Sequence, residues 1–170
     1  MYKRKLGTKV DPQSKDSIRK IAQEARDGLG IRQAKVNIVA LLETLQSLDE
    51  IEIEIIEDHE FSGCEEAIAY PDRNFIQVKN SIYESASNGC GHSIFTLAHE
   101  FGHLILHKDQ KPSFARGEHK IFEDSEWQAD TFASEFLMDS RHIEKGDDAK
   151  ELVKKFGVTH HAAQVRISKL

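Results

Sequence analysis

The 170-residue sequence predicts an α+β fold, in which a short mixed β-sheet packs on helices. Apolar stripes with helical spacing appear before and after a group of strand candidates. Within that group, Ile51, Ile53 and Ile55 alternate with acidic residues, which is typical of a strand with one solvated face. With 39% apolar residues, the chain is long enough for one compact core with small appendages.

Residues 1–48 are predicted to form an N-terminal helical segment that packs on the core. Its first helix ends near Gly28 and Gly30, because glycine commonly terminates helices. A second helix runs from about residue 36 to residue 48. The apolar stripes of these two helices consist of Ile18, Ile21, Ala22 and Ala25, and of Ile38, Leu41, Leu42 and Leu45.

Residues 49–143 are predicted to form the main domain. Two short strands follow the isoleucine-rich one, at residues 67–70 and 75–78, and the segment Pro71-Asp72-Arg73-Asn74 is typical of a hairpin turn between them. We expect the second strand of this pair to lie at an edge of the sheet, although an internal strand would show the same pattern. Its residues are Phe75, Ile76, Gln77 and Val78.

A helix after these strands contains the motif His99-Glu100-Phe101-Gly102-His103. Side chains four residues apart lie on one helical face, about 5–6 Å apart at Cβ, so both histidines can bind one metal ion. Glu100 lies on an adjoining part of the surface, where it can reach a metal-bound water without being a ligand. This arrangement is typical of zinc peptidases.

A second helix supplies two carboxylates at the same spacing, Glu126 and Asp130. We predict that Glu126 is the third zinc ligand, which leaves a fourth position for water. Asp130, one turn later, would bind the outer nitrogen of a ligating histidine and orient its ring. The alternative is that both are solvated acids near a helix N-terminus. The apolar stripe of this helix is Ala129, Phe132, Ala133, Phe136 and Leu137.

Other potential ligands are interpreted as structural. His107 continues the row of histidines, but eight residues of helix rise about 12 Å, too far for His99 and His107 to share an ion. Cys90, just before the motif, is expected to be a free thiol rather than a ligand. Tyr83, His92 and His142 are weaker candidates for stabilising an oxyanion.

Residues 144–170 are predicted to form a helix-turn-helix-like tail, with Gly157 ending one helix and Thr159 capping the next. From Arg141 to the end of the sequence, seven basic residues stand against four acidic ones, a net charge of +3. This excess is small for a phosphate-binding surface. We therefore expect packing on the core or docking of a protein partner rather than direct DNA binding.

The segments 95–107 and 126–138 together resemble the two ligand helices of the ImmA/IrrE family of metallo-endopeptidases, and the tail is similar to that of many members. The resemblance implies a small gluzincin-like zinc peptidase domain with His99, His103 and Glu126 as ligands of one Zn²⁺ and Glu100 as the catalytic carboxylate. It also implies cleavage of a helix-turn-helix transcriptional repressor, which induces a mobile element or a stress response. The sequence departs from the family pattern in two places, the segment Gly91–Ile94 and residue Asp139.

The predicted function is therefore zinc-dependent endopeptidase activity on a repressor protein, with the strand at 75–78 pairing with the extended substrate. The alternative is a regulatory module of the same fold that binds a repressor without cleaving it. The sequence contains no run of about 18 apolar residues, no apolar stretch behind its basic N-terminal residues and only two cysteines, Cys64 and Cys90. These observations predict a cytoplasmic protein without membrane contact.

Overall fold

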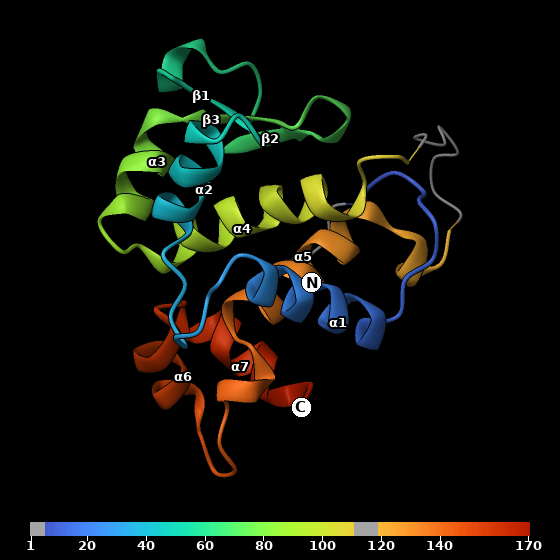
Figure 1. The fold of residues 1–170 in the computed structure, drawn as a ribbon, viewed down its shortest axis with the longest axis vertical. Helices are drawn as coiled ribbons and strands as arrows, with labels where there is room; N and C mark the ends of the chain where they lie inside the picture. The colour runs from blue at the N-terminus through green and yellow to red at the C-terminus, as the bar shows by residue number, and fades with distance from the viewer. Residues whose placement is uncertain (1–5, 111–118) are drawn as a thin grey trace.

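The computed structural model describes residues 6–110 and 119–170. It is an α+β structure in which a three-stranded sheet lies at one end and helix α4 crosses the middle of the molecule (Figure 1). The strands are β1 (Glu52–Ile56), β2 (Ala67–Tyr70) and β3 (Phe75–Lys79). The helices in the described residues are α1 (Lys15–Gly28), α2 (Ile38–Ser47), α3 (Asn80–Ser87), α4 (Gly91–Leu106), α5 (Ser125–Leu137), α6 (Ala149–Phe156) and α7 (His160–Ser168).

The sheet has the order β1-β3-β2, so β3 is its central strand. β1 pairs with β3 in parallel and β2 pairs with β3 in antiparallel, which makes the sheet mixed, as expected. The hairpin between β2 and β3 is confirmed: a short 3₁₀ turn spans Pro71–Arg73, and Asn74 takes a left-handed conformation with φ 46°.

The central place of β3 contradicts the expectation of an edge strand at Phe75, Ile76, Gln77 and Val78. The side of β3 expected to be open is paired with β1, with Glu52 opposite Phe75 and Ile55 opposite Val78. The edge strand on the other side of the hairpin is β2, and it packs beside α4. The edge that faces the histidine helix therefore belongs to Ala67–Tyr70.

The N-terminal segment forms two helices, as predicted. Ser14 caps α1 by accepting a hydrogen bond from Ser17 N, and Asn37 caps α2 in the same way through Ala40 N. α1 packs against α5, and α2 packs against α3 and α4. Helix α3 was not expected from the sequence; it is short and connects β3 to α4.

α4 packs closely on α5, and this contact brings together the two helices that bear the expected ligands. A Cβ atom on Gly102 would lie only 2.9 Å from Phe132 Cδ1 and 3.3 Å from Ala129 O, so the absence of a side chain permits this approach. Next to Gly102, Phe101 packs edge-on against Phe132 and Phe136. This contact fixes α4 relative to α5 directly behind the histidines.

The last two helices form a pair around Gly157, which takes a left-handed conformation with φ 69° and ends α6. Thr159 caps α7 by accepting a hydrogen bond from Ala162 N. α7 is joined to α5 by a fully buried ion pair between Arg166 and Glu135. No helix in the described residues is both long enough and apolar enough to cross a bilayer.

Candidate metal centre

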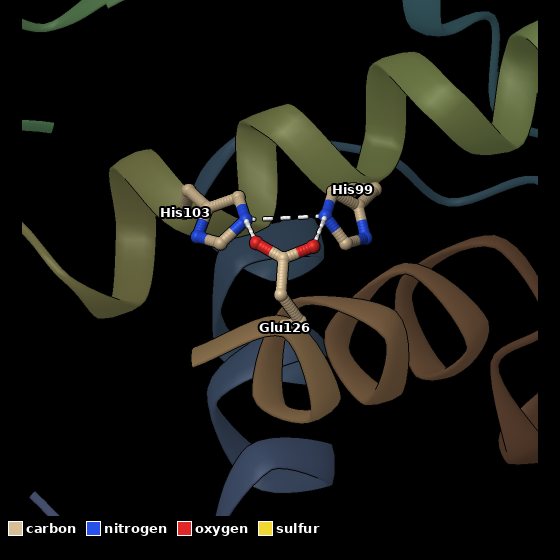
Figure 2. Close-up of side chains that lie close together, drawn as sticks. All are labelled: His99, His103 and Glu126. Atoms are coloured by element: carbon tan, nitrogen blue, oxygen red, sulfur yellow. Dashed lines mark hydrogen bonds and ion pairs between the residues drawn. The ribbon is translucent and has the colours of Figure 1, made fainter. Parts of the chain in front are cut away.

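His99 and His103 project from one face of α4 towards the beginning of α5 (Figure 2). Their Nε2 atoms are 3.1 Å apart, and the planes of the two rings are inclined at 76°. Two unprotonated imidazole nitrogens that face each other at this distance repel unless a cation lies near both of them. The pair is therefore arranged as a site for a shared proton or metal ion.

Glu126 completes the group from the first turn of α5. Its Oε1 lies 3.2 Å from His103 Nε2 and its Oε2 lies 3.3 Å from His99 Nε2 (Figure 2). The three ligand atoms lie within 4.8 Å of one another, and this is the one such group among the described residues. Two imidazole nitrogens and one carboxylate fit Zn²⁺, which takes this ligand set in catalytic sites and keeps a fourth position open.

Each histidine also has a partner at its outer nitrogen. His99 Nδ1 is 2.7 Å from Asp130 Oδ1, as predicted for a carboxylate one turn after Glu126. His103 Nδ1 is 2.9 Å from Nδ1 of His107, and His107 Nε2 is 3.0 Å from Gln128 Oε1. With these outer partners, both Nε2 atoms face Glu126, where a metal ion could be bound.

Glu100 is buried beside this group, with only 8% of its surface exposed. Its Oε2 accepts a 2.8 Å hydrogen bond from the backbone N–H of Ala69 in β2. Burial raises the pKa of Glu100, and this effect outweighs the lowering effect of the neighbouring histidines. A carboxylate with a raised pKa is better suited to exchange protons near neutral pH.

The charges in the group favour a bound cation. Burial acts to lower the pKa of His99, but hydrogen bonds to Asp130 and Glu126 raise it to about 10. For Glu126, burial acts to raise the pKa, but hydrogen bonds to His103 and His99 lower it below its ordinary value. In the absence of a metal, a proton on His99 therefore provides the positive charge that the carboxylates require.

The family model of the IrrE N-terminal-like domain, Peptidase M78, matches residues 64–168, which include the whole ligand group and Glu100. The chain belongs to this family. Its fold is thus that of a metallopeptidase-like domain, and the resemblance seen in the sequence is confirmed. A comparison with curated proteins finds no significant match.

Among solved structures, a chain described as a Mycobacterium tuberculosis transcriptional regulator has a similar fold, with a TM-score of 0.61. The two sequences are 20% identical, and the match covers 90% of the present chain and 46% of the regulator. The M78 chain thus spans less than half the length of that protein. At this identity the likeness concerns the fold alone.

A cleft of about 470 Å³ in this M78 domain is lined in part by Glu100, His103 and Glu126. One wall is the edge strand β2, and the other includes an N-terminal arm at residues 6–10 that the sequence did not indicate. In the arm, Gly7 N donates to Asp124 and Thr8 N donates to Ser125 Oγ. A Cβ atom on Gly7 would lie 2.7 Å from Glu126 N, so glycine lets the arm pass directly over Glu126.

Several residues considered from the sequence lie apart from the group. Tyr83 donates its hydroxyl hydrogen to Glu43, and His92 Nε2 is 2.9 Å from Glu66 Oε1. Neither of these two residues, nor His142, is among the described residues that line the cleft. Cys64 and Cys90 are free and exposed, and neither belongs to the ligand group found in the described residues. These five residues therefore lie outside the ligand group of the described residues.

Proposed function

We propose that this M78 protein is a zinc-dependent endopeptidase of the gluzincin type. The observation that carries the proposal is the convergence of His99, His103 and Glu126 within 4.8 Å, from two separate helices. Zn²⁺ bound there supplies a Lewis acid that polarises a peptide carbonyl and lowers the pKa of a water molecule to about 7. Glu100 is the residue beside this group that can exchange protons with the substrate.

The proposed role of Glu100 follows from how it is held. Ala69 N–H fixes Oε2, so Oε1 remains to accept a proton from the attacking water and to deliver it to the leaving amine. The raised pKa of Glu100 assists the second of these transfers. Glu100 is thus the catalytic residue, and Asp130 acts through His99 as a positioning residue.

The substrate strand is proposed to pair with β2 instead of β3. Ala69 N–H points away from β3, towards Glu100, whereas Glu66 O accepts a hydrogen bond from Lys79 N in β3. Because main-chain groups alternate along a strand, the N–H and C=O of Ala67 point to the same side of β2 as the N–H of Ala69, away from β3. An extended peptide that adds to this edge would run along the cleft past Glu100.

The proposed substrate is a helix-turn-helix transcriptional repressor. This part of the proposal is supported by the match to the IrrE-like family. A repressor substrate would place the reaction in the cytoplasm. The docking of α7 on α5 through Arg166 and Glu135 supports a tail that packs on the core rather than one that binds DNA directly.

The test is intact mass spectrometry of candidate repressors incubated with the zinc-loaded protein. Cleavage yields two fragments whose masses sum to that of the repressor plus one water. Glu100→Gln should bind zinc normally but cleave about 10²–10⁴-fold more slowly, because the general base is lost. Glu24→Gln, on the exposed side of α1, is the matched control and should cleave at the wild-type rate.

Two results would contradict the proposal. Cleavage by Glu100→Gln at the wild-type rate would show that this carboxylate has no part in the chemistry. A stable, chelator-insensitive complex with an uncleaved repressor would instead indicate the regulatory binding module.

A further inference from the structure

The ring of His103 uses both of its nitrogen atoms. Nε2 faces His99 and Glu126, and Nδ1 lies 2.9 Å from Nδ1 of His107. A neutral imidazole has one N–H and one acceptor nitrogen. If Nε2 of His103 provides its lone pair to a metal ion, its Nδ1 carries the hydrogen and requires an acceptor.

The hydrogen bonds of Gln128 determine which ring nitrogen of His107 carries the hydrogen. Gln128 Nε2 donates to two backbone oxygens, Asp11 O and Phe122 O, each at 2.8 Å. Because carbonyl oxygens only accept, the amide nitrogen must lie on that side and Oε1 must face His107. Oε1 also only accepts, so the hydrogen in the 3.0 Å contact belongs to His107 Nε2. In neutral His107, Nδ1 is then an acceptor.

We propose that His107 is a positioning residue of the metal centre, which holds His103 in the tautomer that presents Nε2 as a ligand. The inference rests on the proposed zinc site and extends it by one residue. The hydrogen bonds run in one direction, from His103 Nδ1–H to His107 Nδ1 and from His107 Nε2–H to Gln128 Oε1. His107 thus does for His103 what Asp130 does for His99.

Burial makes this arrangement difficult to replace with water. His107 is 6% exposed and Gln128 is 1% exposed, whereas the side chain of Asp130 is 57% exposed. Loss of the acceptor at His107 would leave the N–H of His103 unpaired or reverse its tautomer, and either change weakens the ligand. His107 therefore acts through His103 and is not itself a ligand.

The experiment measures Zn²⁺ affinity by competition with a chromophoric chelator in folded, full-length variants. His107→Leu removes the acceptor and should weaken affinity by about tenfold or more, within the 10–100-fold typical of such partners. His107→Asn places an amide oxygen near the Nδ1 position and should stay within about threefold of wild type. His161→Leu, an exposed histidine on α7, is the control and should bind zinc as wild type does.

Recovery of zinc affinity in His107→Asn relative to His107→Leu is the readout that a merely structural role would not produce. A long-range ¹H–¹⁵N correlation spectrum of the zinc-loaded wild-type protein then tests the direction of the hydrogen bonds. It should show His107 protonated at Nε2 and unprotonated at Nδ1. If His107→Leu does not fold, His107→Gln takes its place, because its longer side chain reaches towards Gln128 and leaves no acceptor at the Nδ1 position.

The outcomes separate this inference from the function on which it rests. Unchanged zinc affinity in His107→Leu or His107→Gln, or a His107 ring protonated at Nδ1, would overturn the role of His107 and leave the metal centre standing. A wild-type protein that binds no zinc would overturn both.

Discussion

Helix α5 carries a buried or partly buried carboxylate near each end, and the two have different partners. Near the C-terminal end, Glu135 accepts hydrogen bonds from both terminal nitrogens of Arg166, at 2.6 and 2.7 Å. It also accepts one from Arg19 Nε at 3.2 Å. Near the N-terminal end, the ion-pair partners of Glu126 within the described residues are His99 and His103, at 3.2–3.3 Å. Both carboxylates are held in place, but by groups of different chemistry.

The two carboxylates differ in the chemistry of their partners, and this difference separates the structural acid Glu135 from the proposed metal ligand Glu126. Arginine is always charged and neutralises Glu135 permanently, so that end of α5 fastens α7 to the core. Histidine can release its proton and offer the same nitrogen to a metal, so the other end can exchange a proton for Zn²⁺. One helix thus serves stability at one end and the proposed chemistry at the other.

The largest expected effect of changing either carboxylate is a loss of stability at Glu135. Glu135→Ala should lower the free energy of unfolding by about 3–5 kcal/mol, because it leaves the buried guanidinium of Arg166 unpaired. Urea unfolding of the metal-free protein measures this change, with Glu24→Ala as a surface control within about 0.5 kcal/mol of wild type. A loss no larger than that of the control would mean that Glu135 does not fasten the helices.

Glu126→Ala should mainly affect zinc binding rather than stability. We expect zinc affinity to fall by more than the roughly 100-fold upper limit for a partner that only supports a ligand. The metal-free variant should lose less unfolding free energy than Glu135→Ala. Calorimetric titration with Zn²⁺ and urea unfolding test both parts, and retained zinc affinity would remove Glu126 from the ligand set.

Asp130→Asn should have an intermediate effect. Its carboxylate binds His99 Nδ1 at 2.7 Å, and loss of such a partner typically weakens metal affinity by about 10–100-fold. Chelator competition measures the change. Affinity equal to that of the wild type would show that Asp130 is a solvated acid, which is the alternative that the sequence left open.

Zinc affinity should also depend on pH. Because the pKa of His99 is raised to about 10 in the metal-free protein, its ring is protonated at neutral pH and must release that proton when zinc binds. Apparent affinity should therefore rise with pH, by about tenfold per unit for one released proton, and fall as the solution is acidified. Titrations in buffers with different ionisation enthalpies count the protons, and a count of zero would contradict the charge state assigned to His99.

The candidate ligand group could be predicted from the sequence because its parts depend on local geometry. Helical spacing alone places His99 above His103, and the same spacing places Asp130 one turn after Glu126. Residue chemistry and the family resemblance predict that the two helices meet. The close contact at Gly102 that permits it depends on which residues of α5 lie opposite, which no local pattern specifies.

The order of the strands in the sheet could not be predicted from local sequence patterns. A parallel partner such as β1 joins β3 through a long connection, and no local signal records that pairing. One indication was present: Phe75 and Ile76 are adjacent apolar residues on opposite faces, and both are buried, as is typical of a central strand. Helical spacing separates His107 from His99, but it does not specify the contact between His107 Nδ1 and His103 Nδ1 on which the proposed role of His107 rests.

The measurement that tests the central claim most directly is anomalous diffraction at the zinc absorption edge from crystals of the zinc-loaded protein. We predict one peak per chain, about 2.0–2.2 Å from His99 Nε2, His103 Nε2 and a carboxylate oxygen of Glu126. No peak at this position under zinc-replete conditions, or a peak bound to other residues, would contradict the account.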